Sequence, residues 1–132
     1  KTRKIDYLDG HQHIHMIPDI FKVCVKLAEK YNIPRIRMVN EQIENSLPKL
    51  YNPIRWSGEK LMGAWAKTNS KEIENSSLYY TRNYFGLRYS GNYHLIRNYL
   101  KTLIKTERES DIEINFHSAI VTKSLIQQYP WF

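Results

Sequence analysis

Four side chains that can bind a metal or move a proton recur at every second position near the start of the chain. The segment reads Asp9-Gly10-His11-Gln12-His13-Ile14-His15. Alternate side chains of a β-strand share a face, so on a strand the carboxylate and the three imidazoles would point into one space. Neutral imidazoles bind divalent cations, and a nearby carboxylate can bind the ion or orient an imidazole. The pattern therefore indicates a pocket for a metal, a substrate or both.

A structural role is the alternative for the same histidines. An HxHxH run can also form a packed or hydrogen-bonded cluster, and same-face neighbours on a strand lie about 6–7 Å apart. That spacing is too wide for three imidazoles of one strand to bind one ion. We therefore expect one or two metal ligands from this run, with the remaining imidazole contacting substrate.

Three further residues follow other expected strands. His117 lies at the carboxyl end of the last one, where functional side chains gather in parallel α/β folds, and it could act as a general acid or stabilise an oxyanion. An ordinary surface or core histidine is the alternative. Arg37 and Glu41 follow the second expected strand, with a surface ion pair as their alternative.

The elements that would position these residues alternate between strand and helix. Residues 5–15 read as a strand. Pro18 suits the first turn of a helix, in which Ile20, Val23, Leu27, Ala28 and Tyr31 recur with helical spacing and predict one buried face. A second strand is expected over residues 35–39. This strand–helix–strand order favours a parallel sheet.

The rest of the chain continues the pattern. The expected elements are a helix over 58–67, a polar connection or helix over 69–77, a strand over 79–85, a helix over 95–103 and an alternating strand over 111–117. The 132 residues, 42% of them hydrophobic, are enough to bury a core. We therefore expect a single α/β domain over residues 1–132.

Charge and composition narrow the classes of partner. The net charge is +7, but Lys22, Lys26 and Lys30 recur every four residues, as on the solvated face of a helix, so nucleic acid is an unlikely partner. No apolar run reaches the roughly 20 residues of a membrane span, so no membrane association is expected. The single cysteine and the lack of a signal-peptide pattern favour a cytoplasmic protein.

Several motifs of the chain resemble those of the YdjC-like family of carbohydrate deacetylases. The longest match runs from Leu8 to Pro18, and Ile33-Pro34-Arg35-Ile36-Arg37 follows it with Glu41 beyond. Two later stretches, 84–91 and 113–117, are similar to later motifs of the family and occur in the family's order. The resemblance covers nearly the whole chain.

The resemblance implies part of a TIM-like (β/α) barrel, with the N-terminal portion missing. It also implies that a divalent metal, Mg²⁺ or Zn²⁺, assists hydrolysis of the N-acetyl group of an amino sugar or oligosaccharide. The positions carried over are His11 and His13 as metal ligands, His117 and Asp9 as catalytic residues, and His15, Arg37 and Glu41 as substrate-binding residues.

Two departures from the family shape the expectation. Nothing in the chain matches the family's N-terminal Asp-Asp motif and its additional histidine, and Ser118 and Ala119 stand where members usually have proline and glycine. We therefore expect weak activity from this chain alone, and an acetylated sugar together with the missing half or a second copy as partners. A catalytically inactive remnant or an interaction module of the same fold is the alternative.

Overall fold

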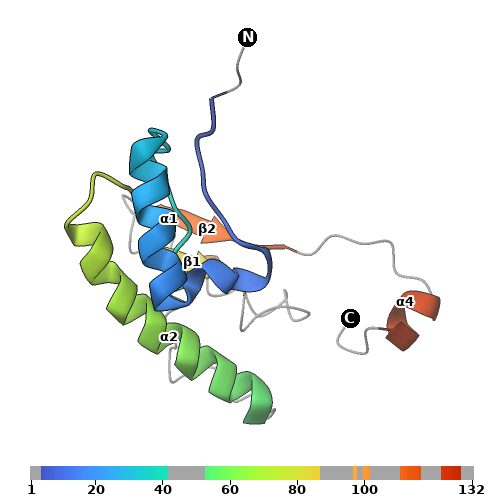
Figure 1. Ribbon diagram of the computed structural model, residues 1–132. Coiled ribbons are helices and arrows are strands. Elements are labelled where there is room, and N and C mark those ends of the chain that lie inside the picture. The colour runs from blue at the N-terminus through green and yellow to red at the C-terminus, as the bar shows by residue number, and fades with distance from the viewer. Residues whose placement is uncertain are drawn as a thin grey trace.

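The computed structural model describes residues 4–41, 53–86, 97, 100–101, 111–116 and 123–128. Its elements are η1 (His11–Met16), α1 (Pro18–Lys30), α2 (Pro53–Glu74), β1 (Asn83–Phe85), β2 (Ile112–Ile114) and α4 (Lys123–Gln128) (Figure 1). Within these ranges, no helix is long and apolar enough to cross a membrane.

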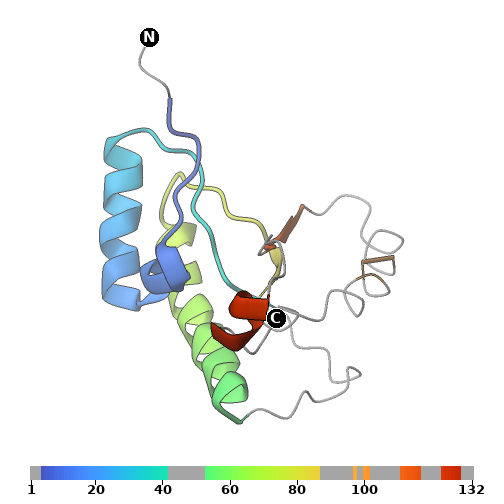
Figure 2. The ribbon, with the colours of Figure 1, turned by 90° about the vertical axis from the view of Figure 1, so that its right-hand side faces the viewer.

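Extended segments pair in parallel and in chain order. Leu8 forms a bridge with Ile36, Arg35 forms one with Tyr79, and β1 pairs with β2. Helix α1 lies between the first two segments, and α2 leads to the third (Figure 2). The expected parallel α/β arrangement is thus confirmed. The described strands do not close into a barrel, so the TIM-like barrel stays a prediction.

One face of these segments is apolar and packs against the helices. Leu8 and Ile36 are bridged, so their side chains lie on the same side, and Ile36 and Met38 are almost fully buried. Figure 1 shows α1 and α2 together on one side of the strands. The core cluster also contains Met16, Phe21, Val25, Ala28, Ile33, Val39, Ala66, Ile73 and Leu78, and it extends to Tyr84, whose ring lies beside Arg37.

Helix α1 begins and ends as its sequence predicts, but it buries a different face. Pro18 occupies its first turn, and Asn32 adopts φ 53° just after the helix ends. Phe21, Val25 and Ala28 are the buried residues. The expected buried stripe was therefore wrong except at Ala28, because the helix carries two apolar stripes and only the one containing the bulky Phe21 meets the sheet.

Helix α2 is longer than the expected 58–67 segment and includes most of the polar stretch that follows it. Its residue Asn69 is fully buried, and the Asn69 Nδ2 donates a hydrogen bond of 2.8 Å to the carbonyl oxygen of Met16. Ala66 and Ile73 are buried on the same helix. The polar Asn69 is thus part of the packing because it ties α2 to η1.

Of the expected strand over residues 5–15, only Leu8 forms a bridge, and the extended segment ends before His11. Residues 11–16 form the 3₁₀ helix η1, with left-handed backbone at Gln12 (φ 50°) and His13 (φ 60°). The chain folds back so tightly that a Cβ on Gly10 would lie 2.7 Å from His15 Nδ1. The alternation expected of a strand is therefore lost, and His11 is exposed while His15 is 2% exposed.

The later elements agree in part with the sequence. The expected strand over 79–85 is present as a bridge at Tyr79 followed by β1, and the strand expected over 111–117 contains β2. Of the expected 95–103 helix, residues 97, 100 and 101 are helical and the others lie outside the described residues. Helix α4 contacts none of the other described helices and strands.

Candidate functional site

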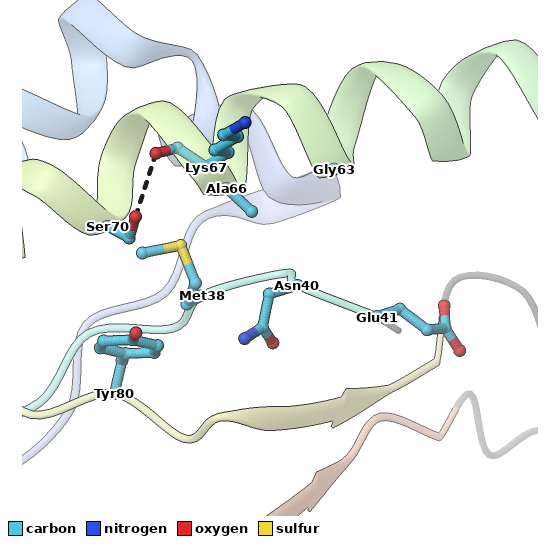
Figure 3. A pocket seen from close by; sticks show the side chains of 8 residues that line it. All are labelled: Met38, Asn40, Glu41, Gly63, Ala66, Lys67, Ser70 and Tyr80. Atoms are coloured by element: carbon cyan, nitrogen blue, oxygen red, sulfur yellow. Dashed lines mark hydrogen bonds between the residues drawn. The ribbon is translucent and has the colours of Figure 1, made fainter. Parts of the chain in front are cut away.

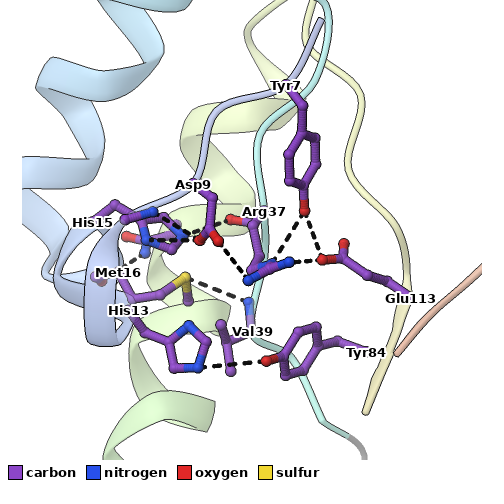
Figure 4. Close-up of polar contacts among 11 residues, drawn as sticks. Tyr7, Asp9, His13, His15, Met16, Arg37, Val39, Tyr84 and Glu113 are labelled. Atoms are coloured by element: carbon purple, nitrogen blue, oxygen red, sulfur yellow. Dashed lines mark hydrogen bonds and ion pairs between the residues drawn. The ribbon is translucent and has the colours of Figure 1, made fainter. Parts of the chain in front are cut away.

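Arg37 is the centre of a polar cluster on the face of the strands that is turned away from the helices. Its Nη1 donates to Asp9 Oδ2 and its Nε donates to Glu113 Oε1, both at 2.5 Å (Figure 4). The side chains of Arg37 and Glu113 are each 16% exposed, and that of Asp9 is 34% exposed. One cation thus joins two carboxylates from distant parts of the chain.

Strand alternation explains why these charged groups meet. Arg37 follows the core residue Ile36 and so points to the opposite side of its segment. Asp9 follows Leu8 in the same way, and Tyr84 is paired in register with Glu113. The polar cluster therefore shares its backbone with the core but lies on the opposite face.

Tyr7 completes the cluster from the first segment. Its hydroxyl donates to Glu113 Oε1 at 2.6 Å and accepts a bond from Arg37 Nε at 3.2 Å. The Arg37 Cζ lies 5.7 Å from the centre of the Tyr7 ring, within range of a cation–π contact. Burial and the hydrogen bond to Glu113 raise the pKa of Tyr7, so this hydroxyl stays a proton donor at neutral pH.

Arg37 keeps its charge in this setting. Burial alone would lower the pKa of Arg37, but the hydrogen bond to Tyr7 and the negative charge of Glu113 outweigh burial and raise it. Guanidinium groups present planar forks of N–H donors that match oxygen atoms of carboxylates and similar groups. The cluster therefore holds a permanent cation with N–H groups left over for a further acceptor.

His15 is buried next to this cluster and is neutral. Its Nε2 lies 3.1 Å from the carbonyl oxygen of Arg37, which can only accept, so Nε2 carries the proton. Burial lowers the pKa of His15, although the hydrogen bond to the Arg37 carbonyl and the charge of Asp9 partly oppose this. The lone pair of Nδ1 then faces Asp9 Oδ1 at 3.7 Å. That distance is too long for a hydrogen bond, so the buried Nδ1 has no hydrogen-bond partner among the described residues.

His13 lies on the far side of His15, against Tyr84. The two imidazole rings are 6.4 Å apart in an edge-on arrangement, and His13 Nε2 is 3.4 Å from the Tyr84 hydroxyl. Burial raises the pKa of Tyr84 to about 12, and the nearby charge of Arg37 opposes that rise. Figure 4 shows His13, His15 and Arg37 bordering one region of the strand face.

The described residues do not by themselves complete the expected metal site. Within the described ranges, no three His, Cys, Asp or Glu side chains are grouped so that they could hold a metal ion. Asp9 is held by Arg37, and His15 Nε2 is held by a backbone carbonyl. His11 is exposed and makes no hydrogen bond or ion pair with another described residue.

The structure separates the sequence candidates into four groups. Asp9, His13, His15 and Arg37 come together on a turn and two segments rather than on one strand, whereas His11, expected in the same pocket, is exposed. The Glu41 carboxylate instead accepts a hydrogen bond of 3.3 Å from the backbone N–H of Gly86. His117 lies outside the described residues.

Glu41 also borders a separate open pocket on the helix side of the strands (Figure 3). The pocket has a volume of about 330 Å³. It is lined by Gly63, Ala66, Lys67 and Ser70 of α2 and by Met38, Asn40, Glu41 and Tyr80. Because Met38 lies on the same face as Ile36, this pocket is on the opposite side from the Arg37 cluster.

Three residues of the cluster were not among the sequence candidates: Tyr7, Tyr84 and Glu113. Signals for two of them were present in the sequence. Tyr7 lies two positions before Asp9 and so shares its face on an extended segment, and Glu113 lies on the polar side of the alternating 111–117 segment. Tyr84 begins the 84–91 stretch that resembles a family motif, but its own position favoured a core role, since buried tyrosines are common in cores.

Comparison with known proteins gives one match. The family model described as YdjC-like protein matches residues 2–130 of the 132-residue chain. No curated protein and no solved structure matches.

Proposed function

The chain belongs to the YdjC-like family, and from this premise we propose that it takes part in hydrolysis of the N-acetyl group of an amino sugar or oligosaccharide. The observation that supports a reaction at this place is the cluster in which Arg37 joins Asp9 and Glu113 next to a neutral, buried His15. Such a concentration of charged groups with shifted pKa values is typical of functional sites.

Arg37 is proposed to bind an oxygen atom of the substrate. Its Nε and Nη1 are directed by Glu113 and Asp9, so the plane of the guanidinium is fixed before a substrate arrives. The remaining N–H groups can donate to a sugar hydroxyl or to the acetamide oxygen, where negative charge develops during attack by water. Tyr7 and Glu113 act as positioning residues for Arg37 in this proposal.

Asp9 is proposed as the group that receives a proton from the attacking water. It is the most exposed charged member of the cluster, and His15 Nδ1 faces it at 3.7 Å. The water oxygen bonds to the acetamide carbon, the C–N bond breaks, and the leaving nitrogen takes a proton from His117. The products are acetate and a free amine.

A divalent metal, Mg²⁺ or Zn²⁺, belongs to the proposal through the family resemblance. Such an ion would polarise the acetamide carbonyl and activate water. His11 and His13 are the residues of this chain proposed to bind it, and the further ligands must come from outside the described residues.

Metal titration by calorimetry is the first test of that part. Mg²⁺ and Zn²⁺ are titrated into the chain and into a His11→Ala variant. Stoichiometric binding that is lost in the variant supports a metal site at His11. Absence of binding to both proteins means that this chain does not hold the ion without a complementary piece.

Acetate release from N-acetylglucosamine and its short oligosaccharides tests the reaction itself. The chain is assayed alone and together with a separately produced N-terminal portion of a YdjC-like protein. We expect little turnover by the chain alone and turnover by the mixture. An Arg37→Gln variant should reduce the rate of the mixture at least about tenfold. The matched control, Arg35→Gln, lies two residues earlier at an exposed position and should not reduce the rate.

No turnover by the mixture, with no metal binding, would favour the alternative of an inactive remnant or an interaction module. Turnover that is unchanged in Arg37→Gln would contradict the role given to the cluster.

A further inference from the structure

The hydrogen-bond ladder between the first two segments ends after Leu8. The Leu8 N–H donates to the Arg35 carbonyl oxygen, and the Arg37 N–H donates to the Leu8 carbonyl oxygen, both at 2.9 Å. Bonds along a parallel pair recur at every second residue. A continued ladder would therefore join the Gly10 N–H to the Arg37 carbonyl oxygen and the Val39 N–H to the Gly10 carbonyl oxygen.

Gly10 makes neither of these bonds, because the chain turns away from the sheet into η1 at this residue. Its N–H donates to Asp9 Oδ1 at 2.7 Å, and its carbonyl oxygen accepts from the His13 N–H at 3.0 Å. Two backbone groups of the second segment, the Arg37 carbonyl and the Val39 N–H, thus lose the partners that a strand would supply. Buried backbone groups without partners are costly, so other donors and acceptors must replace the strand.

Two side chains at the end of η1 take both places. His15 Nε2 donates to the Arg37 carbonyl oxygen at 3.1 Å. Met16 Sδ accepts a bond from the Val39 N–H at 3.4 Å (Figure 4). His15 is 2% exposed and Met16 is fully buried. The turn therefore carries its own replacement for the strand that it interrupts.

The His15 ring has little freedom to leave this place. A Cβ on Gly10 would lie 2.7 Å from His15 Nδ1, so the ring lies against the Gly10 backbone where a side chain would be. At the next residue, the Met16 carbonyl oxygen accepts a bond of 2.8 Å from Asn69 Nδ2, and Asn69 is itself fully buried. The second segment, the Gly10 backbone and α2 thus hold residues 15 and 16 from three sides.

We propose that His15 is a positioning residue for Arg37 and does not itself contact the substrate. The Arg37 N–H is held by Leu8 and the Arg37 carbonyl oxygen by His15, so both backbone polar groups of this residue are fixed. The guanidinium projects from that fixed backbone to Asp9 and Glu113. A side chain that is 2% exposed has too little free surface to bind a sugar directly.

This role extends the proposed function, in which Arg37 binds an oxygen atom of the substrate. The positioning itself depends only on contacts among described residues, so it holds even in a chain that hydrolyses nothing. The two parts therefore have separate tests.

Nuclear magnetic resonance of the wild-type chain tests the bond from His15 without any substitution. Long-range ¹H–¹⁵N correlations of the imidazoles show which ring nitrogen carries the proton near neutral pH. We expect the proton of His15 on Nε2, because a carbonyl oxygen can only accept a hydrogen bond. A His15 ring with its proton on Nδ1 overturns the proposal.

Hydrogen exchange of the Arg37 Nε–H with water tests the effect on the guanidinium. His15→Met fills a similar volume but has no donor, so the Arg37 Nε–H should exchange at least about tenfold faster. His15→Gln keeps an N–H group at a similar distance from the backbone and should restore slow exchange. Val25→Ala is the control for lost packing, since Val25 is buried in α1, and it should leave this exchange rate unchanged.

Unchanged exchange in His15→Met overturns the positioning role, and so does equal acceleration by Val25→Ala. If His15→Met does not fold, as judged by circular dichroism, His15→Asn gives the same comparison, because its amide is too short to reach the Arg37 carbonyl.

Acetate release by the mixture with the N-terminal portion judges the proposed function separately. In an active mixture, His15→Met should lower the rate and His15→Gln should recover most of it. An inactive mixture together with faster exchange in His15→Met would reject the reaction but keep the positioning of Arg37 by His15.

Discussion

The two faces of the parallel segments differ in nearly every physical respect, although they share one backbone. Ile36 is fully buried among apolar side chains under the helices, whereas its neighbour Arg37 forms ion pairs with Asp9 and Glu113 on the other side. Strand alternation alone makes the division. One face can thus stabilise the fold while the other holds reactive groups.

The two faces should contribute unequally to stability. Burial of apolar side chains is the main favourable term in folding, whereas the attraction within a partly buried ion pair is largely offset by the loss of water around the charges. Side chains of the polar face can therefore be replaced at a modest cost in the free energy of unfolding. The following substitutions test this asymmetry, beginning with the largest effect.

Phe21→Ala should destabilise the chain most. Phe21 is fully buried between α1 and the sheet, and its truncation leaves a cavity that costs about 3–5 kcal/mol. Urea unfolding followed by circular dichroism measures the change. Val23→Ala, at an exposed position of the same helix, should cost less than about 1 kcal/mol. Equal effects of the two variants would show that α1 does not pack as described.

Arg37→Gln should cost less, about 1–3 kcal/mol, because it leaves two carboxylates without their shared cation. The same unfolding measurement applies. The matched control is Lys22→Gln, which breaks the exposed pair with Glu72 and should change stability by less than about 0.5 kcal/mol. A loss larger than that of Phe21→Ala would contradict the asymmetry between the faces.

Two glycine substitutions should act in opposite directions. An added Cβ at Gly10 would meet His15 Nδ1 at 2.7 Å, so Gly10→Ala must displace the His15 ring or η1 at a cost of about 1–2 kcal/mol. Gly63 lies in α2 with open space around its Cα, so Gly63→Ala should stabilise by up to about 1 kcal/mol. Melting temperatures of both variants would show the contrast.

The pH dependence of His15 should give the smallest effect. Burial lowers the pKa of His15 in the folded chain below the ordinary value of about 6.5, so the unfolded chain binds a proton first as the pH falls. Stability therefore declines below about pH 6.5 through this group. A His15→Gln variant should lose less stability between pH 7 and pH 5 than His11→Gln, in which the exposed imidazole is removed. Equal losses would contradict the burial of His15.

The sequence predicted α1 well but not its orientation. Pro18 and the helical spacing of apolar residues were sufficient for its bounds, because these signals are local. Which stripe is buried depends on the sheet below, and both the stripe with Phe21 and the one with Leu27 satisfy the helical period.

The Asp9–His15 run shows a similar limit. Its alternation is equally compatible with a strand and with a turn, and the left-handed backbone at Gln12 and His13 has no local cue such as a glycine at either position. Tertiary contacts decide the outcome, since His15 Nε2 hydrogen-bonds to the carbonyl oxygen of Arg37. The prediction that the run supplies a polar pocket is nevertheless consistent with the cluster. Its metal ligands stay a prediction.

The sequence also identified Arg37 without identifying its partners. Glu41, four residues away, was the nearest candidate, but Arg37 pairs with Asp9 and Glu113. Pairing between strands depends on the order of strands in the sheet, which no local pattern reveals.

Arg37 joins two carboxylates that are far apart in the sequence, and this determines when its two ion pairs can form during synthesis. Arg37 is 28 residues from Asp9 and 76 residues from Glu113 along the chain. During synthesis at about 5–20 residues per second, the Arg37–Asp9 pair would wait roughly 4–15 s for Glu113 to emerge. During synthesis, the contact between Arg37 and Glu113 can therefore form only after the pair of Arg37 and Asp9 is complete.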